Sequence, residues 1–242
     1  MKNIKDAVTF NELKWDTEFF GVSSSKAILH RPLTLQEWDE LKKRFKEYKF
    51  ISIMNKHSEP INAQLIGKDT SAFLADVNLQ FEKKIVSSNE MPTNVIIQQI
   101  LEKNEQIIQI ADFQFSKFTE DPELAKRGGD QIYRQWLINS FGQPDKFYAL
   151  SRNEVGDING FILFSYSDGS CVIELIAVSK KETKGGIGTS LFKAVEHVAH
   201  QRGYSKIKVG TQVRNMGAIN FYHKVGCKQI GCHQVYHYWD NN

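Results

Sequence analysis

The residues from 174 to 200 read ELIAVSKKETKGGIGTSLFKAVEHVAH: an apolar run, a polar turn, a group of glycines and a helical pattern. The run 174–178 is too apolar for a strand with one face in water, so it predicts a buried strand. Leu191, Val195 and Val198 recur at helical spacing, which predicts a helix that packs on this strand. A glycine-rich corner therefore joins a buried strand to a helix.

The glycine-rich corner is a candidate phosphate site. Glycines let the backbone approach a ligand, and the positive end of the following helix favours an anion there. A pyrophosphate would fit against the six residues of the corner, which are Gly185, Gly186, Ile187, Gly188, Thr189 and Ser190. The Walker motif is excluded because no lysine follows Gly188, and the dinucleotide motif is disfavoured because Leu191 stands where that motif needs glycine or alanine. A tight turn without a ligand is the remaining alternative.

Four segments of the C-terminal half together resemble the GNAT family of acetyl-CoA-dependent N-acetyltransferases. They are VIELIAVS (172–179), TKGGIGTSLFKAVEHVAHQRG (183–203), KIKVGTQV (206–213) and NMGAINFYHKVGC (215–227). The family's turn begins with Arg or Gln, where this chain has Thr183, whereas Gly186 and Gly188 match the family. The resemblance implies an α/β GNAT fold with a mixed central sheet and acetyl-CoA as co-substrate. Lys184 would add positive charge near the bound CoA.

The resemblance also assigns roles near the last helix. Tyr222 matches the family's tyrosine, so we expect it to act as the general acid that protonates the leaving thiolate. Its spacing from Ala218 and Val225 predicts equally well a side chain that packs inward. Asn215 begins the helix, where asparagine is a favoured N-cap, and the family places an asparagine there against the CoA arm.

The strand before the glycine corner carries the remaining candidates. The resemblance implies that this strand diverges from 206–213, so that the pantetheine arm bonds to the backbone of Ile176, Ala177 and Val178. The Val178 N–H would then face the thioester oxygen. Glu174 is a candidate base for the amine's proton, because some family members use an acid on this strand. A structural ion pair is the alternative for a carboxylate in so apolar a strand.

A second resemblance concerns the acceptor. The segment NELKWDTEFFG (11–21) is similar to the start of the WecD-type dTDP-fucosamine acetyltransferases, although its aromatic residues also predict a packing cluster over an N-terminal core. The similarity continues in YRQWLINSF (133–141), VGTQVRN (209–215) and VYHYW (235–239). It implies acetyl transfer to the amine of a dTDP-linked amino-deoxy sugar, for cell-surface polysaccharide. A GNAT enzyme for another small amine and a non-catalytic acyl-CoA-binding module are the alternatives.

The pattern along the chain predicts an N-terminal α/β domain over 1–90, a linker over 91–104 and an acetyltransferase domain over 105–242. The resemblance implies that the first domain is a truncated copy of the second and supports one side of the substrate cleft. In the first we expect strands over 26–30 and 50–54, one or two further strands over 71–85, a short helix from Pro60, and a helix capped by Thr34 and Glu37. In the second we expect a first strand over 106–115, a helix over 130–141 and strands over 147–150 and 158–165.

Composition limits the remaining functions. A net charge of +3 over 242 residues is too small to indicate a nucleic-acid partner. The chain lacks an apolar run that could act as a signal peptide or cross a membrane, so we expect a cytoplasmic protein, and a homodimer stays open. The three cysteines lack metal-ligand spacing, so we expect structural thiols and no metal. Arg134 is either a surface residue or a contact for a nucleotide diphosphate.

Overall fold

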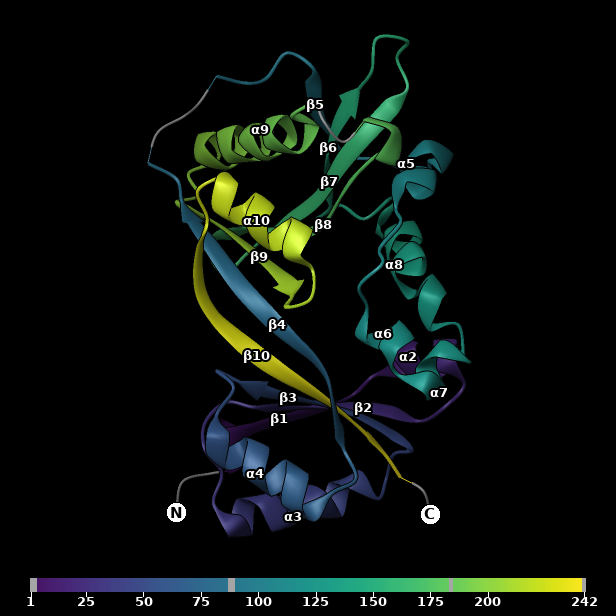
Figure 1. The fold of residues 1–242 in the computed structure, drawn as a ribbon, viewed down its shortest axis with the longest axis vertical. Coiled ribbons are helices and arrows are strands. Elements are labelled where there is room, and N and C mark those ends of the chain that lie inside the picture. The colour runs from purple at the N-terminus through teal and green to yellow at the C-terminus, as the bar shows by residue number, and fades with distance from the viewer. Residues whose placement is uncertain (1–3, 87–89, 183–184, 241–242) are drawn as a thin grey trace.

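The computed structural model describes residues 4–86, 90–182 and 185–240, and within them one mixed sheet runs through the molecule (Figure 1). The strands are β1 (Val8–Glu12), β2 (Ser24–Leu29), β3 (Phe50–Lys56), β4 (Phe73–Lys84), β5 (Val95–Gln98), β6 (Phe147–Arg152), β7 (Ile158–Ser167), β8 (Ser170–Val178), β9 (Lys206–Gln212) and β10 (Lys228–Trp239). Their order in the sheet is β1-β2-β3-β10-β4-β9-β8-β7-β6-β5. The predicted α/β class with a mixed sheet is confirmed.

Helices cover both faces of this sheet. They are α1 (Ile4–Ala7), α2 (Lys14–Phe20), α3 (Leu35–Phe45), α4 (Pro60–Asp69), α5 (Glu105–Ile110), α6 (Lys117–Glu120), α7 (Pro122–Ala125), α8 (Ile132–Ser140), α9 (Ile187–Gln201) and α10 (Met216–Lys224), with 3-10 turns η1 (Gly129–Gln131) and η2 (Lys180–Glu182). Beside β6 to β9, α9 and α10 lie on one face and α5 and α8 on the other (Figure 1). The C-terminal part of the sheet is therefore buried on both faces, as its apolar strands require.

The same order of elements occurs twice in the chain. In the N-terminal half, the segment β2–α3–β3–α4–β4 has two parallel strands joined by a helix, then a second helix and a long strand. The C-terminal half repeats this order as β8–α9–β9–α10–β10. These two five-element segments are called here the N-terminal unit and the C-terminal unit.

The two units exchange their last strands. The long strand β4 of the N-terminal unit pairs with β9, and β10 of the C-terminal unit pairs with β3. The strands β4 and β10 also pair with each other, and in Figure 1 they cross the middle of the molecule side by side. The predicted domain limits stay a prediction, but the sheet continues across them because β10 completes the N-terminal unit.

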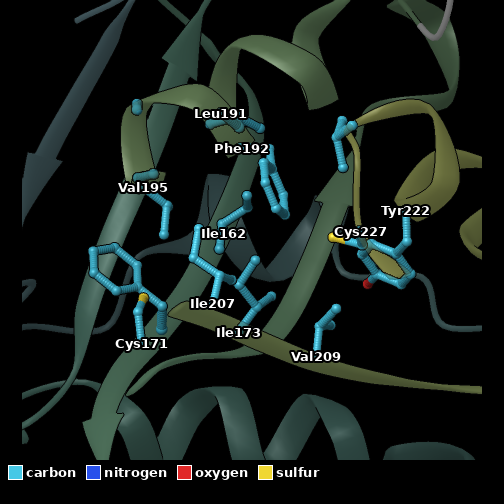
Figure 2. Close-up of a cluster of buried hydrophobic side chains, with 14 of the residues drawn as sticks. Ile162, Cys171, Ile173, Leu191, Phe192, Val195, Ile207, Val209, Tyr222 and Cys227 are labelled. Carbon is cyan, nitrogen blue, oxygen red and sulfur yellow. The ribbon is translucent and has the colours of Figure 1, made fainter. Parts of the chain in front are cut away.

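The main core of the C-terminal unit lies between the sheet and α9 and α10 (Figure 2). Leu191 and Val195 of α9 are fully buried there, and each such side chain stabilises the fold by about 1.5–3 kcal/mol. Cys171 and Cys227 belong to this core, and burial raises the pKa of the first thiol to about 12 and of the second to about 11. All three cysteines are free, in agreement with the prediction of structural thiols.

The predicted strand over 106–115 is wrong. Residues Glu105–Ile110 form the helix α5, whose N-terminus is capped by the Asn104 side chain, which accepts from the Ile107 N–H at 3.2 Å. A short apolar run does not distinguish a strand from a buried helix. The outer strand position next to β6 is filled instead by β5, which lies within the predicted linker.

The segment from α5 to α8 forms a lobe that packs on the aromatic segment of α2. Phe20 stacks on Phe118 at 6.0 Å between ring centroids, and Trp15 lies 6.3 Å from Trp136. The carboxylate of Asp121 also binds the last strand, with Oδ2 2.7 Å from Nδ1 of a buried histidine, His237. The aromatic cluster therefore joins the N-terminal segment to the lobe rather than covering an N-terminal core alone.

Candidate active site

The strands β8 and β9 separate part of the way along their length. Their register pairs are Cys171 with Ile207, Val172 with Lys208 and Ile173 with Val209. In the described chain β8 continues to Val178 and β9 to Gln212 without a further pair between them. On its other side, β8 has a register shift against β7 next to Glu174, which bends the strand.

A cavity of about 450 Å³ fills the gap between the separated strands. Its wall includes six of the predicted site residues, namely Glu174, Ile176, Ala177, Val178, Asn215 and Tyr222. Across from them, the cavity is lined by Asn78 of β4, Gly210 and Gln212 of β9, Tyr133 of α8 and the segment between α5 and α6. The structure therefore brings the predicted catalytic residues to one cavity that passes through the sheet.

The glycine corner lies at the start of α9, outside the lining of this cavity. Gly186 is the N-cap residue with φ of 72°, and in the described part of the chain no side chain caps the helix. Gly188 approaches Phe221 so closely that a Cβ atom would lie 3.1 Å from its ring. Thr183 and Lys184 lie outside the described residues. Among the residues that the structure describes, no capping side chain takes the first N–H groups of α9, and this is the arrangement that an anion needs.

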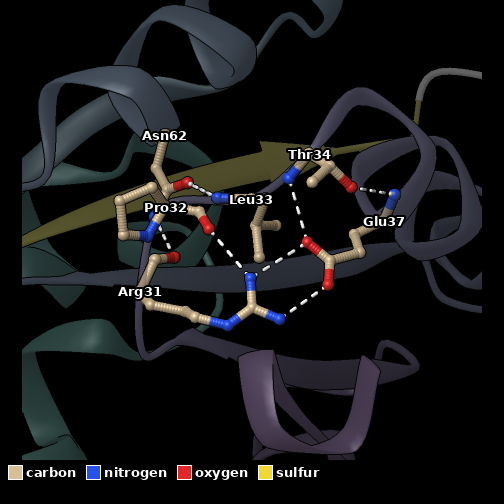
Figure 3. A network of polar contacts seen from close by, with 6 residues as sticks. All are labelled: Arg31, Pro32, Leu33, Thr34, Glu37 and Asn62. Atoms are coloured by element: carbon tan, nitrogen blue, oxygen red, sulfur yellow. Dashed lines mark hydrogen bonds and ion pairs between the residues drawn. The ribbon is translucent and has the colours of Figure 1, made fainter. Parts of the chain in front are cut away.

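The equivalent helix start in the N-terminal unit is filled by its own side chains (Figure 3). The Thr34 hydroxyl accepts from the Glu37 N–H at 3.2 Å, and Glu37 Oε2 accepts from the Thr34 N–H at 2.9 Å, as the predicted capping box requires. Arg31 forms an ion pair with Glu37 at 2.6 Å. Hydrogen bonds from Arg31 and from the Thr34 backbone lower the pKa of Glu37 from 4.5 to about 2. A carboxylate of the chain thus occupies the position of an anionic ligand.

Tyr222 combines the two roles that its spacing left open. Its side chain is 2% exposed and belongs to the core, with its ring 5.5 Å from that of Phe81, yet it also lines the cavity. Burial raises its pKa, so the phenol stays protonated at neutral pH and can donate a hydrogen bond. The neighbouring His223 is exposed, as expected for the next residue on a helix.

Glu174 is exposed at the bulge of β8 and has two partners on the adjoining segments. Its Oε1 lies 2.6 Å from Lys146 Nζ and also accepts a hydrogen bond from the Ser165 hydroxyl. The ion pair that the sequence offered as an alternative is therefore present. The same carboxylate lines the cavity, and this position is compatible with the role of a base toward an amine bound there.

Two further candidates have clear positions. Asn215 is the N-cap of α10, where its side chain accepts from the Ala218 N–H at 3.0 Å, and it faces the cavity as well. Arg134 is exposed and does not line the cavity. Sequence reasoning missed Phe113 and Phe115, which line the cavity, because it assigned their segment to a strand.

A sequence model of the acetyltransferase (GNAT) family matches residues 105–227, just over half of the chain. The chain belongs to the GNAT family. This match covers the cavity wall from β8 to α10, whereas the whole N-terminal unit lies outside it. The GNAT family uses acetyl-CoA, and the open strand pair and the uncapped start of α9 fit such a co-substrate.

Comparison with known proteins supports the family and leaves the substrate open. The chain is 23% identical over 127 residues to the spore coat polysaccharide biosynthesis protein SpsD of Bacillus subtilis. The aligned region covers 52% of this chain and 44% of SpsD. It is 34% identical over 117 residues to the uncharacterized protein YdhI of the same organism, covering 48% of this chain and 65% of YdhI. The chain thus spans less than two thirds of either relative.

A solved structure shows the same fold over nearly the whole chain. The GCN5-related N-acetyltransferase from Sphaerobacter thermophilus superposes with a TM-score of 0.62 at 12% identity, covering 96% of this chain and 76% of that one.

Among the described residues, no group of three or more His, Cys, Asp or Glu side chains could hold a metal ion. No described helix has the length and apolar character needed to cross a membrane.

Proposed function

We propose that this GNAT protein transfers the acetyl group of acetyl-CoA to the amine of a dTDP-linked amino-deoxy sugar. The observation that carries acetyl transfer is the separation of β8 from β9 around a cavity lined by Tyr222, beside a helix start without a capping side chain. Since acetyl-CoA is a cytoplasmic metabolite, the proposed reaction belongs to the cytoplasm.

When bound, acetyl-CoA supplies an activated acyl group as a thioester. Three parts of the chain would hold it: the N–H groups at 185–190 for the phosphates, the free backbone edge of Ile176 to Val178 for the pantetheine arm, and Asn215. Tyr222 donates its phenolic proton to the thiolate that leaves. Glu174 takes the proton of the acceptor amine, with Lys146 and Ser165 fixing its orientation.

The proposed acceptor is supported by chemistry and by likeness. Neutral polar side chains line the cavity on the side opposite β8, among them Asn78, Gln212 and Tyr133, and they suit an acceptor with several hydroxyl groups. One relative bears a name that refers to polysaccharide biosynthesis. A different small amine remains the second candidate within the same chemistry.

A non-catalytic acyl-CoA-binding module is the candidate from another class. Such a protein would need the open strand pair and the start of α9, but it would not need a protonated phenol beside the cavity. The position of Tyr222 therefore favours the enzyme.

The test is acetyl transfer by the purified full chain. The protein is incubated with acetyl-CoA and dTDP-4-amino-4,6-dideoxygalactose, other dTDP-amino sugars or unlinked glucosamine, while release of free thiol is followed. We expect thiol release that requires a dTDP-amino sugar and a product heavier by one acetyl group. Equal rates with unlinked amines would contradict the proposed acceptor, and binding of acetyl-CoA without thiol release from any amine would favour the binding module.

A further inference from the structure

A second, smaller cavity of about 160 Å³ adjoins the main one. It is lined by residues of β4 and α6 and by the end of β9, including Asp76, Ser116, Lys117, Gln212 and Arg214. Gln212 lines both cavities. The smaller cavity therefore begins where the acceptor side of the main cavity ends.

Side chains contact one another where the two cavities share Gln212. Gln212 Nε2 donates to the Tyr133 hydroxyl oxygen at 3.2 Å, and this hydroxyl also hydrogen-bonds with Ser116. On β4, Asn78 lines the main cavity and Asp76 the smaller one, and residues two apart on a strand point to the same face. A ligand in the main cavity could thus extend past Gln212 into the smaller one.

Asp76 and Lys117 are half-buried charges that form no ion pair in the described part of the chain. Burial raises the pKa of Asp76 to about 6 and lowers that of Lys117 to about 8. The other two charged residues of the cavity, Glu120 and Arg214, already pair at 2.6 Å. Asp76 accepts a hydrogen bond from the Val77 backbone, and the Lys117 ammonium group lies 5.0 Å from the centre of the Phe118 ring. Neither contact uses the full hydrogen-bonding capacity of a charged group, so both side chains can still bind a ligand in the cavity.

The charges around the cavity also limit what it can bind. Its wall holds two acidic and two basic side chains, which cancel, and the nearby pair Asp16 and Lys26 adds no net charge. A diphosphate needs an excess of positive charge, which this wall does not offer. A neutral group with both donors and acceptors fits a carboxylate beside an ammonium group, and the apolar side chains of Leu74, Val77 and Val213 suit the face of a ring.

We propose that the smaller cavity holds a neutral polar ring of the acceptor, remote from the amine, with Asp76 accepting from its O–H or N–H and Lys117 donating to its oxygen. This inference rests on the proposed acetyl transfer and deepens it. It makes Asp76 and Lys117 specificity-determining residues that do not touch the reacting atoms.

The test compares Asp76→Asn and Lys117→Met with Lys126→Met, a matched control on α7 whose partner is Glu123 and which lines neither cavity. Initial rates are measured with dTDP-4-amino-4,6-dideoxygalactose and with acetyl-CoA. Loss of a hydrogen bond to a charged group predicts an acceptor KM raised roughly tenfold or more in the first two variants, with kcat within about twofold. The KM for acetyl-CoA and all parameters of the control should stay unchanged.

An unchanged acceptor KM in both variants, with thermal melts that show folded protein, would overturn the inference while acetyl transfer itself stands. Lys117→Gln is the second variant if Lys117→Met fails to fold. If the wild-type protein transfers acetyl to no amine, the proposed function fails, and the inference about the smaller cavity is tested by calorimetric titration with the same dTDP-sugar. Weaker affinity in the Asp76 and Lys117 variants than in the wild type supports the inference. Equal affinity, or no binding to the wild type, contradicts it. Competition by inorganic pyrophosphate that disappears in Lys117→Met would show a phosphate site and contradict a neutral occupant.

Discussion

The N-terminal and C-terminal units share one order of elements and differ where a cofactor would bind. The parallel pair β2 and β3 is joined by six register pairs, from Ser24 with Phe50 to Leu29 with Asn55, whereas three pairs join β8 and β9. The helix that follows β2 begins with the capping box of Thr34 and Glu37, whereas the helix that follows β8 begins at Gly186 with no capping side chain among the described residues. The N-terminal unit therefore uses its own side chains and strands to satisfy the backbone N–H groups that, in the C-terminal unit, a ligand could bind.

The comparison teaches what a binding corner requires beyond the fold. A strand–helix turn attracts an anion only while no side chain satisfies its N–H groups, and a cleft in a sheet opens only where the ladder stops. In β8 the ladder is disturbed on both sides, by the early end of pairing with β9 and by the bulge at Glu174 against β7. The pairing of β1 with β2 shows no such shift.

The largest effect is expected for Tyr222→Phe. Removing the phenolic proton donor should lower kcat by about 10² to 10⁴ and leave acetyl-CoA affinity nearly unchanged. Tyr236→Phe is the matched control, because that side chain packs against the N-terminal core and burial also raises the pKa of its phenol. Steady-state kinetics and calorimetry measure both, and an equal loss of rate in the two variants would refute the assignment.

The next effect concerns the bulge that distinguishes β8 from β2. Glu174→Gln should lower kcat/KM by about ten- to a hundredfold if the carboxylate accepts the amine's proton, and the rise of rate with pH on the acid side should flatten. Glu123→Gln is the matched control, because this carboxylate also pairs with a lysine, Lys126, and lines neither cavity. If Glu174→Gln leaves the pH–rate profile unaltered, the carboxylate serves only the ion pair.

A carboxylate placed at the start of α9 should make the C-terminal unit resemble the N-terminal one. Thr189 is the third residue of α9, the position that Glu37 occupies in α3. Thr189→Glu should raise the acetyl-CoA Kd by roughly tenfold, through repulsion of the phosphates and use of the N–H groups, and should stabilise the helix slightly. Thr189→Gln controls for size, and calorimetry that finds identical affinities for both variants would argue against phosphate binding there.

The smallest effect is on stability, at the filled start of α3. Glu37→Gln should destabilise the protein by about 1 kcal/mol at pH 7, because it removes the ion pair with Arg31 while glutamine can keep the hydrogen bonds of the capping box. Because the pKa of Glu37 in the folded state lies near 2, below the ordinary 4.5, its contribution is complete above about pH 4.5 and falls as the pH approaches 2. Urea unfolding should show that the difference in free energy of unfolding between the wild type and Glu37→Gln is smaller at pH 2.5 than at pH 7. The exposed Glu40→Gln variant should show little loss at either pH.

The sequence predicted features that depend on neighbouring residues better than features that depend on contacts between distant residues. The capping box of Thr34 and Glu37 and the helix at Pro60 were found because caps involve neighbouring residues. The exchange of β4 and β10 was missed, since partners such as His233 and Lys56 are far apart in sequence. Asp76 on β4 and Lys117 on α6 are also far apart in the sequence, so the smaller cavity left no motif. For the site, the resemblance named one wall of the main cavity, whereas part of the opposite wall is formed by the misassigned segment at 106–115.

The most direct measurement of the difference between the units is a calorimetric titration of the full chain with acetyl-CoA. We expect one molecule bound per chain, with affinity lowered by Thr189→Glu and unchanged by Glu37→Gln. Two equivalent sites, or no association at millimolar acetyl-CoA, would contradict a single cofactor site in the C-terminal unit.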